Sequence, residues 1–112
     1  MINHIELLYN YFYQYVEKGY KNNLFKDFNI ESISVDFSSK SRRGNLSSNF
    51  YIVANKKLLN EKFNLKDDLI KEISNLFFIE NCEISSNGFI NVNIKKDFIL
   101  NQIENLLLQK NQ

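Results

Sequence analysis

Residues 81–94 have the sequence Asn81-Cys82-Glu83-Ile84-Ser85-Ser86-Asn87-Gly88-Phe89-Ile90-Asn91-Val92-Asn93-Ile94. Two runs typical of β-strands are separated here by Asn87-Gly88. Asn-Gly between such runs is a strong hairpin signal, because a type I′ turn needs positive φ at both central residues. The stretch therefore predicts a β-hairpin with a type I′ turn at Asn87-Gly88.

The residues after the turn alternate in polarity with the period of a β-strand. One predicted face is apolar and suited to a core, and it holds Ile90, Val92 and Ile94. The other face carries amides, a cation and an aromatic ring, from Phe89, Asn91, Asn93 and Lys95. Directly afterwards, Asp97 can cap a helix that begins with Phe98. We take the polar face and this helix start as the candidate functional surface.

Length and composition indicate one globular domain over residues 1–112. The chain is 44% hydrophobic and 14% aromatic, and its formal net charge is +1, so any contact with nucleic acid must be local. The single cysteine, Cys82, excludes an internal disulfide and a multi-cysteine zinc site, and its apolar neighbours favour a buried structural thiol over a nucleophile. The sequence contains neither a membrane-spanning run nor the basic start of a signal peptide, so we expect a cytoplasmic protein without a membrane partner.

Hydrophobic periodicity predicts the remaining elements. A helix over about residues 2–18 would stop at Gly19, and its extra tyrosines Tyr9, Tyr11 and Tyr13 are either a stacking surface or, as we favour, partly buried against the sheet. A strand over Ser32 to Phe37 would direct Ile33, Val35 and Phe37 to the core. Further helices are expected over residues 46–59, with Leu46 and Phe50 inward, and from Asn64, with Asp67 as a capping partner. A last helix would face inward through Ile99, Ile103, Leu106 and Leu107.

The predicted order is helix, strand, two helices, two strands and helix, that is α-β-α-α-β-β-α. It indicates an α+β two-layer sandwich in which about four helices pack on a small, mainly antiparallel sheet.

A polar loop over residues 38–45 contains Lys40 and the two arginines of the chain, Arg42 and Arg43. It is either a phosphate contact at a helix N-terminus or a solvated loop, and the sequence favours neither. It is not a P-loop, because the spacing of that motif is absent.

No catalytic, cofactor or metal site is expected. His4 is the one histidine and lies near the chain end, and no spacing of His, Cys and carboxylates matches a metal site. Asp67-Asp68 is better explained by the charge preference of a helix N-terminus than by paired acid–base catalysis. The residues by themselves indicate a binding module.

Two segments resemble the N-terminal additional domain of arginyl-tRNA synthetases. The first is Gly44-Asn45-Leu46-Ser47-Ser48-Asn49-Phe50-Tyr51-Ile52-Val53-Ala54-Asn55-Lys56-Lys57-Leu58, similar to that family's segment after the first strand. The second is Gly88-Phe89-Ile90-Asn91 with Asn93-Ile94 and Asp97-Phe98-Ile99, similar to the family's last strand and following helix. The chain departs from the family at Arg43, Asn45 and Ser86-Asn87, where His, Asp and Gly-Pro are usual.

The resemblance implies a tRNA-binding domain that contacts the D-loop, at the elbow of arginine tRNA. Such a domain supports aminoacylation by a catalytic domain in cis or in trans, and by itself it has no ATP-dependent arginine–tRNA ligase activity. By position in the family, Phe98 is the expected ring for base stacking, with Lys95, Asn91, Asn93 and Phe89 beside it. Lys40, Arg42 and Arg43 are the expected phosphate contacts. An equally simple role for Phe98 is packing into the core.

A different class of function remains open from the sequence. The chain could be a free-standing protein-interaction or generic RNA-binding module related to that domain, docking through its tyrosine-rich first helix. An exposed apolar patch at Tyr9 and Tyr13 would favour this alternative.

Overall fold

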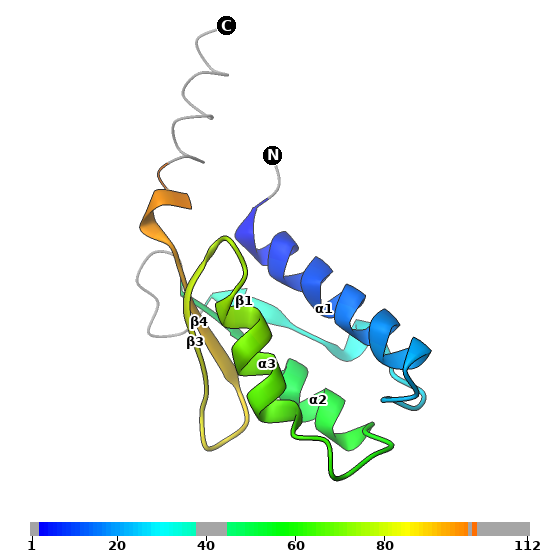
Figure 1. Cartoon of the computed structure of the whole chain (residues 1–112). Helices are drawn as coiled ribbons and strands as arrows, with labels where there is room; N and C mark the ends of the chain where they lie inside the picture. Colours follow the sequence, from blue (N-terminus) through cyan, green and yellow to red (C-terminus); the bar gives the residue numbers. More distant parts are fainter. Residues whose placement is uncertain (1–2, 38–44, 99, 101–112) are drawn as a thin grey trace, which may run out of the picture.

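The computed structural model describes residues 3–37, 45–98 and 100. Within these ranges the elements are α1 (His4–Lys21), η1 (Ile30–Ser32), β1 (Val35–Phe37), β2 (Asn45–Ser48), α2 (Phe50–Lys56), α3 (Leu65–Ser74), β3 (Ile79–Ile84) and β4 (Ile90–Ile94) (Figure 1). Residues 96–98 then begin another helical turn. Ile99, Ile103, Leu106 and Leu107, the expected inward face of the last helix, lie outside the described residues.

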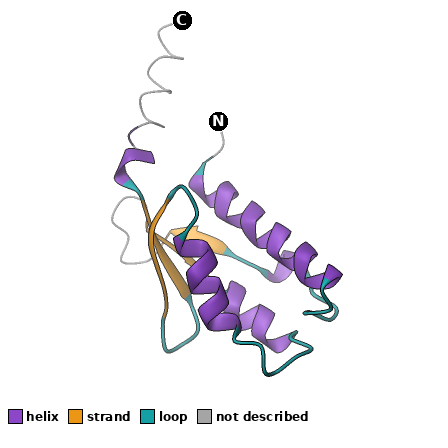
Figure 2. Ribbon diagram, in the orientation of Figure 1, coloured by secondary structure: helices purple, strands orange, loops and turns teal. Residues whose placement is uncertain are grey.

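The four strands form one antiparallel sheet in the order β1-β2-β4-β3. Helices α1, α2 and α3 lie together on one side of the strands (Figure 2). The buried apolar face of β4, which includes Ile90 and Val92, contributes to a core with residues of α1, α2 and α3. The predicted α+β two-layer sandwich with a small antiparallel sheet is therefore confirmed.

Aromatic packing fixes the position of α1 against α2. The rings of Phe12 and Phe50 are both fully buried and stack with a centroid distance of 4.2 Å and an interplanar angle of 4°. Tyr15 meets Phe50 edge-on at 5.8 Å. Burying a phenylalanine side chain stabilises a fold by roughly 1.5–3 kcal/mol, so this cluster is a main contributor to the core.

The predicted stop of the first helix at Gly19 is wrong, because α1 continues to Lys21. Gly19 is buried, and a Cβ atom there would lie 2.4 Å from Cδ2 of Phe25. The glycine therefore serves close packing between the helix and the following segment.

The tyrosines of α1 are largely engaged in packing. The hydroxyl of Tyr9 donates to the carbonyl of Ile30 at 3.2 Å, and that of Tyr11 donates to Glu72 of α3 at 3.0 Å. Both side chains are half-buried against the core, as expected, whereas Tyr13 is 48% exposed. Tyr9 and Tyr13 thus do not form a joint exposed patch.

The first strand is shorter than predicted, because a 3₁₀ turn occupies residues 30–32 and β1 begins at Val35. The Asn49 side chain fixes this segment: its Oδ1 accepts from the Ser34 amide at 2.8 Å, and its Nδ2 donates to the Ser32 carbonyl at 3.0 Å. The predicted core position of Phe37 is wrong. Its ring is 55% exposed and meets the His4 ring edge-on, because β1 is an edge strand that ends near the start of α1.

The prediction of a helix from Leu46 is also wrong, because residues 45–48 form β2 between β1 and β4. Leu46 and Ser48 face the core, and Ser48 Oγ accepts a 3.1 Å hydrogen bond from the Phe50 amide, where α2 begins. The segment is a strand despite its helical pattern because it pairs with β1 on one side and with β4 on the other, and this pairing buries Leu46 and Ser48.

The predicted start of the next helix is confirmed. Asn64 caps α3, with its Oδ1 accepting from the Asp67 amide at 3.2 Å. In return, Asn64 Nδ2 donates to Asp67 Oδ2 at 2.7 Å. Asp67 is therefore a capping partner, as predicted, but it accepts from the side chain of Asn64, whereas in a capping box it would accept from the backbone amide of that residue.

The hairpin is confirmed, but its predicted type I′ turn is wrong. The Ser85 amide donates to the Phe89 carbonyl, and the Gly88 amide donates to the Ser85 carbonyl, both at 2.9 Å. Gly88 has φ +93°, while Asn87 has a negative φ. This is the three-residue loop in which a type I turn precedes a glycine of positive φ, and it accommodates Asn-Gly as well as type I′ does.

Candidate nucleic-acid interface

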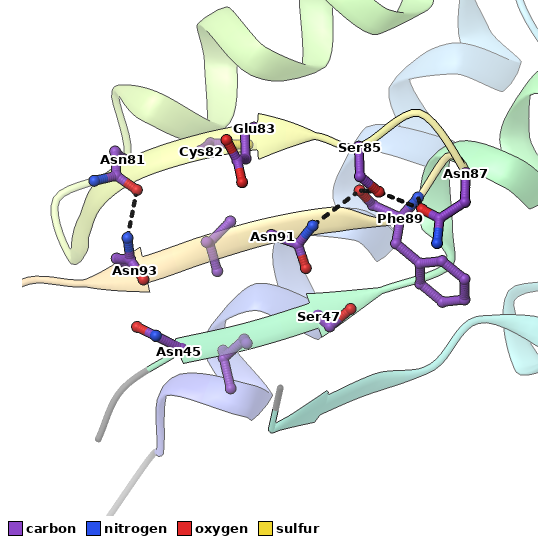
Figure 3. A pocket seen from close by; sticks show the side chains of 12 residues that line it. Asn45, Ser47, Asn81, Cys82, Glu83, Ser85, Asn87, Phe89, Asn91 and Asn93 are labelled. Atoms are coloured by element: carbon purple, nitrogen blue, oxygen red, sulfur yellow. Dashed lines mark hydrogen bonds between the residues drawn. The ribbon is translucent and has the colours of Figure 1, made fainter. Parts of the chain in front are cut away.

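The sheet face opposite the helices contains a hollow of about 810 Å³. It is built from three neighbouring strands, β2, β4 and β3, together with the hairpin loop (Figure 3). Its lining consists of Asn45, Leu46, Ser47, Asn81, Cys82, Glu83, Ser85, Asn87, Phe89, Asn91, Val92 and Asn93. Antiparallel pairing brings these residues together from two distant parts of the sequence.

Strand register arranges most of the polar lining in two rows across the sheet. In the first, which we call the Asn91 row, Asn91 lies between its Cα partners Ser47 and Glu83. In the second, the Asn93 row, Asn93 lies between its Cα partners Asn45 and Asn81. Directly opposed side chains of an antiparallel pair lie about 4.5–5.5 Å apart at Cβ, so each row is a continuous polar band.

Hydrogen bonds orient the central amides of both rows. Asn93 Nδ2 donates to Asn81 Oδ1 at 2.7 Å, which holds the two side chains of the Asn93 row side by side (Figure 3). Asn91 Nδ2 makes a longer bond of 3.4 Å to the Phe89 carbonyl. An amide group offers two donor hydrogens and a carbonyl with two lone pairs, so each of these asparagines keeps capacity for a ligand.

The hollow has an aromatic end and leads toward a cationic side chain at the other end. Phe89, at the hairpin loop, is 39% exposed and its ring lies beside Asn87 (Figure 3). Lys95 comes two residues after Asn93, directly after the end of β4, and is exposed, although it does not line the hollow. Its amide donates to the Phe78 carbonyl at 2.9 Å, which keeps Lys95 next to the end of β4.

Glu83 is the one charged side chain among the lining residues that the structure describes. Its carboxylate repels phosphate but accepts hydrogen bonds from N–H donors. Together with the neutral amides, this charge makes the hollow suited to the polar edge of a neutral ring rather than to a phosphate group.

Cys82 is half-buried opposite Val92 in the β3–β4 pair. Burial, and then the charge of Glu83, raise the pKa of its thiol to about 12. The thiol therefore stays protonated near pH 7, which agrees with a structural cysteine and disfavours a nucleophile.

Of the residues expected to contact tRNA bases, the structure brings Phe89, Asn91 and Asn93 together in the hollow. Phe98 lies elsewhere: its half-buried ring packs against Phe77 at 5.8 Å and Phe78 at 5.7 Å, both measured between ring centroids. The expected phosphate contacts Lys40, Arg42 and Arg43 lie outside the described residues.

Sequence reasoning missed the lining residues contributed by β2 and β3, namely Asn45, Ser47, Asn81 and Glu83. Alternation within Asn81-Cys82-Glu83-Ile84 was a usable signal for two of them, because Cys82 and Ile84 pair with the inward residues Val92 and Ile90. No such signal marked Asn45 and Ser47, since their segment was expected to be helical.

Two other features are absent from the described ranges, a metal-binding cluster and a membrane-spanning helix. No group of three or more His, Cys, Asp or Glu side chains there is arranged to hold a metal ion. Among the helices of residues 3–37, 45–98 and 100, none combines the length and apolarity needed to cross a membrane.

Comparison with known proteins identifies a family whose model matches most of the chain. The family model described as the arginyl tRNA synthetase N terminal domain matches residues 10–94 of the 112-residue chain. The matched range includes all four strands and therefore the whole lining of the hollow. Neither the curated proteins nor the solved structures gave a match.

Proposed function

The chain belongs to the family of arginyl-tRNA synthetase N-terminal domains, and we propose that it binds the D-loop of arginine tRNA in the hollow on its outer sheet face. In this proposal an unstacked loop base packs on the Phe89 ring while its polar edge meets Asn91. The chain supplies recognition only, in the cytoplasm, and the synthetase catalytic domain performs aminoacylation in cis or in trans.

One observation carries this proposal: an exposed aromatic ring lies at the rim of a hollow lined by amides. Proteins read single-stranded RNA loops by stacking bases on aromatic side chains and bonding their exposed edges. Phe89 provides the ring, and Asn91 and Asn93 provide donors and acceptors. Stacking of this kind is worth about 1–3 kcal/mol per base.

The structure also favours Phe89 over Phe98 as the stacking residue. Phe98 is half-buried and already packs against Phe77, edge-on, and against Phe78, so a base would compete with these two rings. Phe89 instead lines the hollow directly. Lys40, Arg42 and Arg43 remain our proposal for phosphate contacts. We add Lys95 to them, although it was expected among the base contacts, because it does not line the hollow.

The proposal is tested by titrating the full chain with two RNAs, intact arginine tRNA and a version with an altered D-loop. We expect tighter binding of the intact tRNA, and we expect Phe89→Ala to reduce this preference by about 1–3 kcal/mol. The matched control is Phe77→Ala, which removes a 68% exposed ring outside the hollow.

Circular dichroism must show that both variants are folded. Equal binding of the two RNAs by the wild-type chain would refute D-loop recognition. A preference that is lost in Phe77→Ala but kept in Phe89→Ala would move the site away from the hollow. If Phe98→Ala, in a folded chain, abolishes the preference while Phe89→Ala keeps it, the stacking residue is Phe98.

A further inference from the structure

We propose that the hollow binds two consecutive, unstacked nucleotides, one on the Asn91 row and the next on the Asn93 row. This proposal rests on the proposed function and adds a second subsite to it. The first subsite consists of Phe89, Asn91, Glu83 and Ser47. The second consists of Asn93, Asn81 and Asn45.

The first argument is size. A volume of about 810 Å³ lies in the upper part of the 300–1,000 Å³ range typical of sites that enclose a drug-sized ligand. A single base is smaller than such a ligand and would fill only the end of the hollow next to Phe89. The lining continues past this end to Asn45, Asn81 and Asn93.

The second argument is the repetition of one chemistry along β4. Asn91 and Asn93 project from the same face, two residues apart, and each is flanked by polar partners from β2 and β3. Two residues of an antiparallel strand span about 6.8 Å. The two rows therefore present similar sets of donors and acceptors at a separation of that order.

This separation decides the conformation of the RNA. Stacked nucleotides advance about 3.4 Å per step along a strand, roughly half the distance between the rows. Two neighbouring bases can face the two rows only if they are unstacked from each other. Splayed bases of this kind are the usual target of sequence-specific RNA recognition in loops.

The third argument is the distribution of charge. The Asn91 row includes the Glu83 carboxylate, whereas the Asn93 row is neutral and lies two residues before the exposed Lys95. Glu83 disfavours a phosphate at the first subsite, and Lys95 favours one beyond the second. The backbone would therefore leave the hollow at the Lys95 end, with the first base directed toward Phe89.

The Asn93 row is also pre-arranged for a ligand. The bond of 2.7 Å from Asn93 Nδ2 to Asn81 Oδ1 fixes both amides and uses one of the two Asn93 hydrogens. The Asn81 amide nitrogen and the Asn93 carbonyl oxygen take no part in this bond. Donors and acceptors that are held in place in this way suit the Watson–Crick edge of a base, which carries both kinds of group.

The experiment combines protein variants with single abasic replacements along the D-loop of arginine tRNA. Each RNA is titrated with the full chain carrying wild-type residues, Asn91→Ala, Asn93→Ala or Asn45→Ala. An abasic replacement should weaken binding by the wild-type chain but have little further effect on a variant that has already lost the contact to that base.

We call a nucleotide silenced by a variant when its abasic replacement no longer weakens binding by that variant. We expect Asn91→Ala and Asn93→Ala to silence two different, adjacent nucleotides. Each variant should weaken binding of intact tRNA about threefold to tenfold, the usual range for one hydrogen bond. Asn45→Ala, which leaves the Asn81–Asn93 bond in place, should silence the same nucleotide as Asn93→Ala. Asn55→Ala, at an exposed position of α2, should change nothing.

Two results would overturn the second subsite while leaving the proposed function intact. The Asn93 and Asn45 variants could bind tRNA as the wild-type chain does, while Phe89→Ala and Asn91→Ala bind weakly. Alternatively, all three asparagine variants could silence one and the same nucleotide, which would mean that both rows contact a single nucleotide. If no D-loop change affects wild-type binding, both proposals fail together.

Discussion

The Tyr15 hydroxyl donates a 2.6 Å hydrogen bond to Asp68 Oδ2, and this bond joins α1 to the first turn of α3. Burial, followed by the bond to Asp68, raises the pKa of Tyr15 above its ordinary value of 10.0. The neutral hydroxyl is the form that can donate to the carboxylate. The contact therefore depends on pH in the alkaline range.

Tyr15→Phe should remove part of this pH dependence. Because the folded pKa is raised, the contribution of Tyr15 is fully present below the unfolded pKa of about 10 and is lost as the pH rises above it. The free energy of unfolding from urea titrations should fall for the variant by about 1 kcal/mol at pH 7. The difference between the two proteins should shrink above pH 10. Tyr13→Phe, an exposed position on the same helix, is the control, and a pH-independent difference would contradict the prediction.

Gly88→Ala should destabilise the hairpin. The glycine has φ +93°, and a Cβ atom there would lie 2.7 Å from Cγ1 of Ile52. Strain and crowding together should lower the free energy of unfolding by about 1–3 kcal/mol, as measured by chemical denaturation. Ser86→Ala changes an exposed residue of the same loop and should have almost no effect. Equal stability of both variants would show that the loop has another conformation.

Asn64→Ala should weaken the start of α3. It removes the bond to the Asp67 amide and the reciprocal bond to the Asp67 carboxylate. Loss of such a cap typically costs about 1 kcal/mol of stability. Thermal unfolding of Asn64→Ala and of the exposed control Asn55→Ala would check this, and identical melting temperatures would argue against the cap.

Arg42→Ala combined with Arg43→Ala should reduce the salt dependence of tRNA binding. If each arginine contacts a phosphate, the slope of log K against log salt should become shallower by about 0.7–0.9 per contact. The preference for the intact D-loop should remain, because phosphate contacts position the RNA without reading its sequence. The double variant Lys26→Ala with Lys62→Ala removes the same charge at exposed positions outside the hollow. If the slope of log K against log salt is unchanged in the arginine variant, Arg42 and Arg43 do not contact phosphates.

The sequence was informative wherever a periodic pattern and a local signal agreed. The inward face of β4 and the Asn64 cap followed directly from alternation and from the capping pattern. The turn type did not, because Asn-Gly fits both a two-residue and a three-residue loop. The choice of loop was decided by the pairing of Ser85 with Phe89.

The sequence did not predict the conformation of residues that depend on partners far away in the chain. Asn45–Ser48 contains no β-branched or aromatic residue, so strand propensity gave no indication of β2. It is a strand because β1 and β4 pair with it on either side. For the same reason the sequence predicted only the part of the candidate site that comes from β4 and the adjacent Phe89, while the parts from β2 and β3 required the register.

The position of β4 has a consequence for the order of events in folding. β4 is the last of the four strands in the sequence but lies inside the sheet, between β2 and β3. Until Ile94 has been synthesised, β2 and β3 lack the strand that pairs with both of them, and the hollow lacks the lining residues of β4. Formation of the hollow must therefore wait for a long-range contact between residues near 46 and 92, which closes slowly compared with local contacts. During synthesis on the ribosome, the hollow can form only after β4 has been made.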